Sequence, residues 1–172
     1  MIDDDGYIRI TDFGIARVWK PENNMDTSGT PGYMAPEQTG LIRERKGKYT
    51  DIFSLGAVLY NLLTYKKAFT GNDLDEVLQK TVNANFPLPS EVTGLNVPYS
   101  LEAVCLKALS KNFEDRYSSV KDLQNEIRDF INGFTTDAEN ASLLKSLQFW
   151  VKRNKTLSLI SFLSLILVLC LV

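Results

Sequence analysis

The chain has 172 residues, a formal net charge of −2 and no histidine. This length suits one domain with an appended segment, and the charge gives no indication of a nucleic-acid partner. The absence of histidine excludes a histidine general base and any histidine-ligated metal within the chain. Cys105 and Cys170 lie far apart in apolar helical patterns, which indicates small hydrophobic residues rather than a disulfide or a metal site.

The first elements that the sequence predicts are two short strands joined by a turn. Asp5-Gly6 stands between the apolar pair Met1-Ile2 and the alternating run 7–11, which is the pattern of a tight β-hairpin. Asp12-Phe13-Gly14 follows the second strand directly. The next residues, 18–30, have no periodicity and contain Pro, Asn, Asp, Ser and Gly, so we expect a solvated loop there.

A long apolar helix is predicted in the middle of the chain. Residues Thr50 to Thr64 are apolar nearly all the way round, which is typical of a helix buried inside a domain. Thr50 is the expected N-cap of this helix. Gly56 is less favourable than alanine by about 1 kcal/mol inside a helix, so we expect a close backbone contact at this position.

Three amphipathic helices are predicted after the central one. The first begins at Asp73, which forms a capping box with Glu76; the second begins at Ser100, and the third runs from about Ser118 to Ile131. The residues expected to face the core are Leu74, Val77, Leu78, Leu101, Val104, Cys105, Ala108, Leu109, Val120, Leu123, Ile127, Phe130 and Ile131.

The C-terminal part has the pattern of a membrane anchor. Residues 132–148 are expected to form an amphipathic helix, and 157–172 are apolar without any charge. An aromatic residue and a basic cluster stand before the apolar run: Trp150, Lys152, Arg153 and Lys155. The run is slightly short of the ~20 residues that span a bilayer, so we expect a truncated transmembrane helix. A tail anchor and a buried core helix are the alternatives.

The stretch from Asp12 to Glu37 resembles the activation segment of a protein kinase. It opens with Asp12-Phe13-Gly14 and closes with Ala35-Pro36-Glu37. The resemblance implies that Asp12 binds a Mg²⁺ ion that bridges the ATP phosphates, because a hard cation prefers carboxylate oxygen. Asp12 as a helix N-cap or a plain turn aspartate is the alternative.

Three hydroxyl side chains lie inside this segment. Thr27 and Ser28 are candidate regulatory phosphorylation sites, and two unmodified loop hydroxyls are the alternative. Thr30 belongs to Gly29-Thr30-Pro31-Gly32-Tyr33, which resembles the P+1 loop of serine/threonine kinases. There the threonine hydroxyl reaches the catalytic aspartate and lysine.

Two further motifs extend the resemblance. The run that starts at Asp51 resembles the beginning of the central helix of kinases, in which the aspartate accepts hydrogen bonds from the catalytic-loop backbone. Arg116 resembles the late arginine that pairs with the glutamate of the Ala-Pro-Glu motif, here Glu37. One departure is Lys66-Lys67-Ala68-Phe69, which stands in place of the more usual Gly-x-x-Pro-Phe and is expected to be a surface turn.

Together, these motifs identify the chain as similar to the C-terminal lobe of bacterial-type (Hanks-type) transmembrane serine/threonine protein kinases. The implied fold is mainly α: the C-lobe of the protein-kinase-like α+β fold with a short N-terminal β-hairpin. The expected domains are 1–131, the C-terminal part of the kinase domain; 132–156, a juxtamembrane linker; and 157–172, the transmembrane helix. The resemblance implies a single-pass membrane protein with its kinase domain in the cytoplasm.

The implied activity is transfer of the γ-phosphate of ATP to serine or threonine of a protein substrate, with ATP and Mg²⁺ as cofactors. The chain lacks a Gly-rich loop, the β3 lysine, the αC glutamate and the His-Arg-Asp catalytic loop. We therefore expect it to be inactive alone and Met1 to be an internal methionine or a fragment boundary. The alternatives are a pseudokinase or scaffold that binds partners at a membrane, and a helical tethering protein without kinase ancestry. The substrate, the signal and dimerisation are left open.

Overall fold

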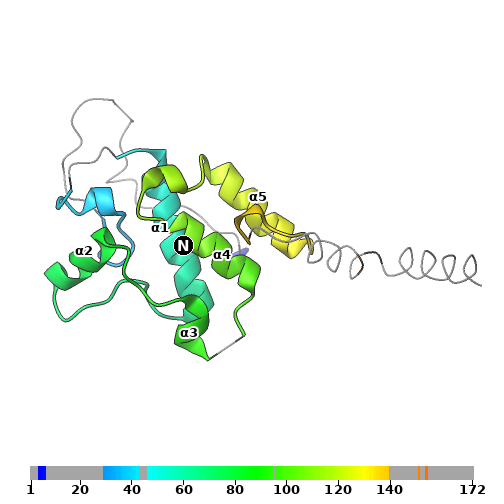
Figure 1. Cartoon of the computed structure of the whole chain (residues 1–172), viewed down its shortest axis with the longest axis horizontal. Helices are drawn as coiled ribbons and strands as arrows, with labels where there is room; N and C mark the ends of the chain where they lie inside the picture. The colour runs from blue at the N-terminus through cyan, green and yellow to red at the C-terminus, as the bar shows by residue number, and fades with distance from the viewer. Residues whose placement is uncertain are drawn as a thin grey trace, which may run out of the picture.

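The computed structural model describes residues 4–6, 29–42, 46–94, 96–139, 151 and 154. Within these residues the chain forms five α-helices and short 3-10 turns but no strand, so the predicted mainly α character is confirmed (Figure 1). Residues 4–6 form a turn with Gly6 at a φ of +83°, while the rest of the predicted hairpin lies outside the described residues. The same holds for the predicted transmembrane run 157–172, and none of the described helices is both long and apolar enough to cross a membrane.

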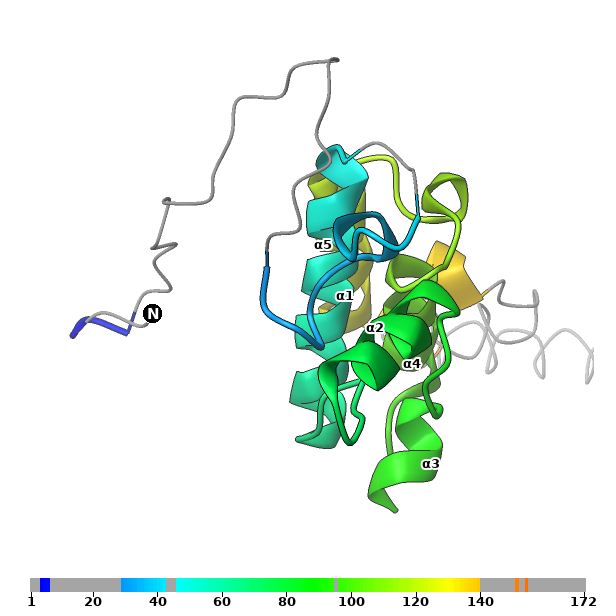
Figure 2. The same cartoon turned by 90° about the vertical axis from the view of Figure 1, so that its left-hand side faces the viewer.

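Helix α1 (Lys48–Thr64) is the central element of the body, and it packs against α4 (Tyr99–Ala108) (Figures 1 and 2). It begins two residues earlier than predicted, and its N-cap is Gly47 rather than Thr50. The Thr50 hydroxyl instead accepts a hydrogen bond from Gly47 N at 3.1 Å. The prediction that Thr50 caps the helix was therefore wrong, although this side chain does satisfy a backbone donor at the helix start.

The contact that Gly56 was predicted to make is present at the crossing of α1 and α4. A Cβ atom added to Gly56 would lie 2.8 Å from the Cβ of Ala108 and 3.2 Å from its carbonyl carbon. The thiol of Cys105 on α4 donates to the carbonyl of Gly56 at 3.5 Å. Burial raises the pKa of this thiol to about 12, so the thiol keeps the proton that it donates.

The main core lies between α1 and the segment that follows it. Phe53 of α1 stacks on Phe69 with ring centroids 5.8 Å apart, and Phe69 meets Phe86 edge-on at 5.2 Å. Phe69 is only 1% exposed and Ala68 is also buried, so the segment that replaces Gly-x-x-Pro-Phe is a surface turn only at its two lysines. Ala68 and Phe69, the second half of the predicted turn, belong to the core instead, and the buried ring of Phe69 contributes a large apolar area to it.

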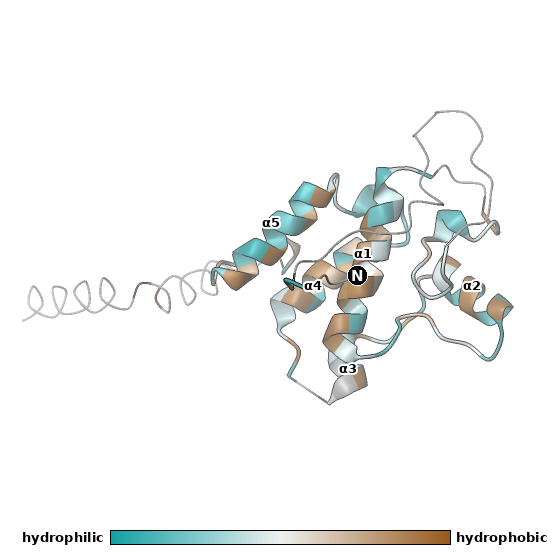
Figure 3. Ribbon diagram, turned by 180° about the vertical axis from the view of Figure 1, so that it is seen from behind, coloured by the Kyte–Doolittle hydropathy of each residue, from teal (hydrophilic) through white to brown (hydrophobic). Residues whose placement is uncertain are grey.

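One face of α1 is exposed, contrary to the prediction of a helix buried on all sides. Leu55, Val58 and Leu62 are 41%, 44% and 68% exposed, and their spacing places them on one side of the helix. Figure 3 shows hydrophobic residues along α1 in the view from behind. We refer to Leu55, Val58 and Leu62 as the α1 apolar face.

Helices α2 (Leu74–Val82) and α3 (Pro89–Thr93) follow the core segment. Asp73 caps α2 by accepting from Glu76 N at 2.8 Å, as predicted. The Glu76 carboxylate accepts from Asn72 N at 2.7 Å instead of from the cap residue itself, so the return half of the capping box is shifted by one residue. Leu78 is buried, but Leu74 in the first turn of α2 is 54% exposed.

Helix α5 (Val120–Ile131) packs on α4 and begins after Ser119, whose hydroxyl accepts from Asp122 N at 3.1 Å. Leu123 is buried, whereas Val120 and Ile131 are 47% and 74% exposed. The predicted apolar stripe is therefore buried only in the middle of the helix.

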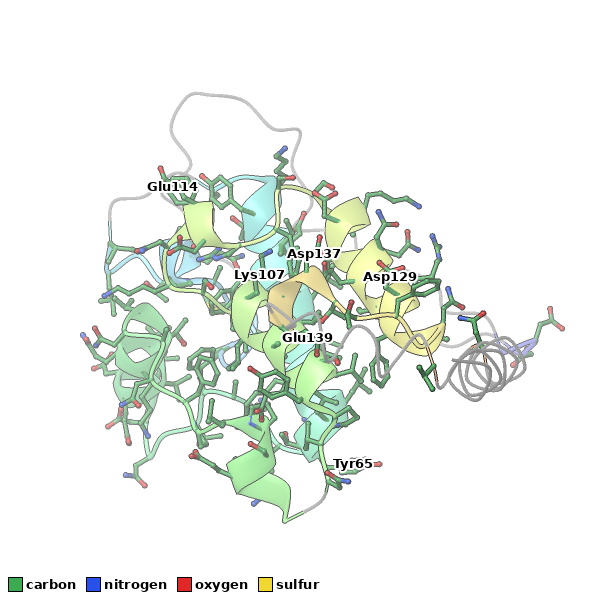
Figure 4. All side chains as sticks on the ribbon, turned by 45° about the vertical axis from the view of Figure 1, so that its right-hand side comes forward. Tyr65, Lys107, Glu114, Asp129, Asp137 and Glu139 are labelled. Carbon is green, nitrogen blue, oxygen red and sulfur yellow. The ribbon has the colours of Figure 1, made fainter. Side chains whose placement is uncertain are left out.

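A short turn, η4 (Asp137–Glu139), lies against α4 (Figure 4). The Glu126 carboxylate of α5 accepts from the backbone N–H groups of Asp137 and Ala138 at 3.2 and 3.1 Å. Ser100 of α4 donates to Glu139 at 2.6 Å. These contacts hold residues 136–139 on the helical body, within the stretch that the sequence predicted to be a juxtamembrane linker.

Candidate functional site

The described end of the predicted activation segment begins with a tight turn over Thr30–Tyr33. Tyr33 N donates to the carbonyl of Thr30 at 3.0 Å, and Gly32 has a φ of +91°, which the third residue of such a turn requires. The hydroxyl of Ser54 donates to the carbonyl of Tyr33 at 2.9 Å. Since Ser54 lies on α1, this bond fixes the turn to the central helix, while Thr30 itself is exposed.

The turn leads into η2 (Pro36–Gln38), which carries Glu37 into the interior. Ala35 N donates to the Gln38 side chain at 2.9 Å and so closes the start of this short turn. Met34 and Ala35 are buried at 4% and 0% exposure. Glu37 is 3% exposed, which means that its carboxylate needs internal partners.

Arg116 is the main partner of Glu37, 79 residues further along the chain. Its two terminal nitrogens donate to the two carboxylate oxygens at 2.8 and 3.1 Å, and both side chains are 0% exposed. This is the bidentate geometry in which charge-assisted hydrogen bonds are strong and directional. The Thr50 hydroxyl adds a third donor to Glu37 at 2.9 Å.

The remaining donors of Arg116 bind backbone carbonyls. They reach Ser110 at 2.8 Å, Tyr49 at 3.1 Å and Lys111 at 3.1 Å, and the guanidinium lies 4.8 Å from the ring centroid of Phe53. All five N–H groups of the guanidinium are therefore used. The arginine joins the end of the predicted activation segment, the start of α1 and the loop after α4 into one unit.

Asp51 lies on α1 in the same row as the α1 apolar face, one turn before Leu55. Its side chain forms no hydrogen bond or ion pair with any described residue. Partial desolvation raises the pKa of this carboxyl group above its usual value. Asp51 thus takes no part in the hydrogen bonds of Glu37 and Arg116, and it stands at the end of an exposed apolar row.

The other predicted site residues, Asp12, Phe13, Gly14, Thr27 and Ser28, lie outside the described residues. Within the described part, no group of three or more acidic, cysteine or histidine side chains is placed to hold a metal ion. The Mg²⁺ site at Asp12 therefore stays a prediction.

Sequence reasoning missed the supporting contacts of the site. The hydroxyls of Thr50 and Ser54 carry no signal in the sequence, because each joins separate segments of the chain. The carbonyls that receive Arg116 carry none either, because every residue has a backbone carbonyl. The motif Asp51-Ile52-Phe53-Ser54 contained one of these residues, but its resemblance to kinases did not indicate what Ser54 binds.

Comparison with known proteins adds a direct line of support. Residues 1–139 match the family model of the protein kinase domain. Serine/threonine-protein kinase PknB of Mycobacterium tuberculosis (strain ATCC 25618 / H37Rv) is 34% identical over 158 residues, which cover 85% of this chain and 25% of that protein. Serine/threonine-protein kinase PrkC of Bacillus subtilis (strain 168) is 33% identical over 132 residues, 74% of this chain and 20% of that protein.

The chain thus spans a quarter or less of the length of these curated relatives. The match over residues 1–139 nevertheless includes every kinase-like motif in the sequence, and the structure joins two of them through Glu37 and Arg116. The chain belongs to the protein kinase domain family and is related to bacterial serine/threonine kinases.

Proposed function

We propose that this chain is the C-terminal lobe of a protein serine/threonine kinase, in which it holds the loop that faces the protein substrate. The observation that carries the proposal is the buried pair of Arg116 and Glu37, which fixes the end of the activation segment to the helical body. Catalysis of phosphoryl transfer depends almost entirely on positioning and on electrostatic stabilisation. A rigid attachment of this loop is what such a reaction requires.

In the proposed reaction, the γ-phosphate of ATP passes to a serine or threonine hydroxyl of the substrate. Thr30 sits in the turn that Ser54 fixes to α1, where its exposed hydroxyl is available to the catalytic residues. Asp51, which has no partner among the described residues, would accept hydrogen bonds from the backbone of the catalytic loop. A bound Mg²⁺ ion would neutralise phosphate charge, with Asp12 as its ligand from this chain.

The α1 apolar face supports the same proposal. In kinases the central helix is covered by the helix that precedes the catalytic loop, and this row of exposed side chains is where such a cover would pack. Each large apolar side chain gains about 1.5–3 kcal/mol on full burial, so the exposed row favours association. We infer that a further part of the kinase covers Leu55, Val58 and Leu62.

We expect polar substitutions on this face to make the 172-residue chain more soluble. The double variant Val58→Gln and Leu62→Gln should remain in the supernatant at a protein concentration several-fold higher than the unchanged chain, with the same helical circular dichroism. A matched control is Lys66→Gln with Lys67→Gln, which changes exposed residues without removing apolar area. Equal solubility of all three proteins would show that the α1 apolar face drives no association.

The activity itself is tested with the complete protein from which this kinase domain comes. Incubation with ATP, Mg²⁺ and a mixed protein substrate should phosphorylate serine or threonine, and Asp12→Asn should lower the rate at least about 100-fold, since metal-based charge stabilisation contributes several kcal/mol. Asp5→Asn, in the exposed turn at residues 4–6, is the matched control and should leave the rate unchanged. A complete protein without phosphoryl transfer that still binds partner proteins would favour the pseudokinase or scaffold.

A further inference from the structure

Two exposed lysines, Lys66 and Lys67, stand where the sequence departs from the usual kinase pattern, and Lys67 lies against the turn Thr30–Tyr33. An added Cβ on Gly32 would lie 3.0 Å from the Cδ of Lys67 and 3.2 Å from the carbonyl oxygen of Phe69. The Nζ of Lys67 is 5.5 Å from the ring centroid of Tyr33. The aliphatic part of Lys67 therefore rests on the turn, and its ammonium group lies over the Tyr33 ring.

Both sides of this contact are held in place. The hydroxyl of Thr64 accepts from Lys66 N at 3.1 Å, and it donates to the carbonyl of Tyr60 at 2.8 Å. On the other side of the two lysines, Phe69 is fixed in the core at 1% exposure. Because the turn is fixed by Ser54, the distance between the lysine backbone and the turn is set by the fold rather than by loop motion.

The two positive charges lack an acidic partner within the described part of the chain. Lys66 has no ion pair there, and the only partner of Lys67 is the uncharged ring of Tyr33. Lys80 on α2 provides the contrast, because it pairs with Glu76 at 2.7 Å and also donates to the carbonyl of Thr70. The charge at Lys66 and Lys67 is therefore available to an anion that approaches the turn.

We propose that Lys66 and Lys67 determine substrate specificity and select protein substrates with Asp or Glu directly after the phosphorylated residue. This inference rests on the proposed kinase function, because it takes the turn Thr30–Tyr33 as the part of the lobe that faces this substrate position. An ammonium group fixed next to the turn attracts a carboxylate and repels a lysine or arginine at the same place. At an exposed site the discrimination is modest, and we expect about a fivefold preference from the pair.

The test uses the complete protein and a peptide library with a fixed central threonine. Two pools differ only in the residue after this threonine, which is Asp in one and the isosteric Asn in the other. Phosphate incorporation should be about fivefold higher for the Asp pool at low salt, and 0.5 M NaCl should reduce this ratio, because salt screens exposed charges. The double variant Lys66→Met and Lys67→Met keeps the aliphatic packing on Gly32 and should bring the ratio close to one.

Three further variants make the result specific to charge at this place. The variant Lys66→Arg with Lys67→Arg should retain the preference, whereas Lys66→Glu with Lys67→Glu should favour a pool with Lys after the threonine. Lys80→Met, which removes a lysine that is already paired on α2, should leave the preference unchanged. Equal incorporation into the Asp and Asn pools by the unchanged protein, or a ratio that survives Lys66→Met with Lys67→Met, would overturn the inference while leaving the kinase function intact. Failure to phosphorylate any pool would overturn both.

Discussion

Replacing Arg116 by methionine should lower the free energy of unfolding by about 3–5 kcal/mol, the usual effect of breaking a buried ion pair by removing one partner. The substitution would leave the Glu37 carboxylate at 0% exposure with the Thr50 hydroxyl as its remaining side-chain donor among the described residues. It would also remove the donors from the carbonyls of Ser110, Tyr49 and Lys111. Urea unfolding followed by far-ultraviolet circular dichroism measures the change through the shift in midpoint.

Companion variants separate the pair from a general effect of losing an arginine. Arg128→Met on α5 removes an exposed arginine and should change the unfolding free energy by less than about 0.5 kcal/mol. Glu37→Gln should also destabilise, because its amide presents a single acceptor oxygen to a guanidinium that uses two. The double variant should be less destabilised than the sum of the two single variants, since the residues share one interaction. Additive effects would contradict direct coupling between Arg116 and Glu37.

The pairing of Glu37 with Arg116 shows what sequence resemblance can supply. The two residues are 79 positions apart, and no periodicity or composition links them; only the order of the kinase-like motifs does. The Thr50 hydroxyl and the three carbonyls that complete the site could not be predicted in this way, because backbone carbonyls carry no residue-specific signal. Thr50 was expected to cap α1, but Gly47 takes that position and leaves the Thr50 hydroxyl free to donate to Glu37.

Hydrophobic periodicity predicted where the helices lie in the sequence better than it predicted which of their residues are buried. Leu78 and Leu123 are buried as expected, but Leu74 and Ile131 are 54% and 74% exposed. A pattern of apolar residues identifies one side of a helix, but it does not reveal where the neighbouring helix ends. The same limit applies to the α1 apolar face. The sequence predicted that α1 is covered on all sides, but it could not indicate which element covers each side.

The close contact at Gly56 was predicted from a different signal, namely a residue that is unfavourable inside a helix. Glycine inside a helix is less stable than alanine by about 1 kcal/mol, so its presence in α1 required a compensating contact. The structure supplies this contact through the close approach of α4, where the thiol of Cys105 also reaches the Gly56 carbonyl. The sequence did not reveal that Ala108 is the neighbour, because this depends on how the two helices cross.

Substituting Gly56 by alanine should destabilise the chain despite the gain in helix propensity. The new Cβ would lie 2.8 Å from the Cβ of Ala108 and 3.2 Å from both the Ala108 carbonyl carbon and the Cγ of Leu109. Overpacking of this kind costs about 1–3 kcal/mol, which exceeds the gain of about 1 kcal/mol from propensity over most of that range. We expect a net loss of roughly 1 kcal/mol for Gly56→Ala and a larger loss for Gly56→Val, measured by the same urea unfolding.

A compensating substitution distinguishes the close approach from a local effect on α1. Ala108→Gly removes the atom nearest to the new Cβ, so the double variant with Gly56→Ala should be less destabilised than the sum of the two single variants. Leu62→Ala changes an exposed position of the same helix and serves as the matched control, with an expected effect within about 0.5 kcal/mol. A stability gain of about 1 kcal/mol for Gly56→Ala would mean that α4 moves away at little cost. In that case the contact with Ala108 would not be the reason that glycine occupies this position.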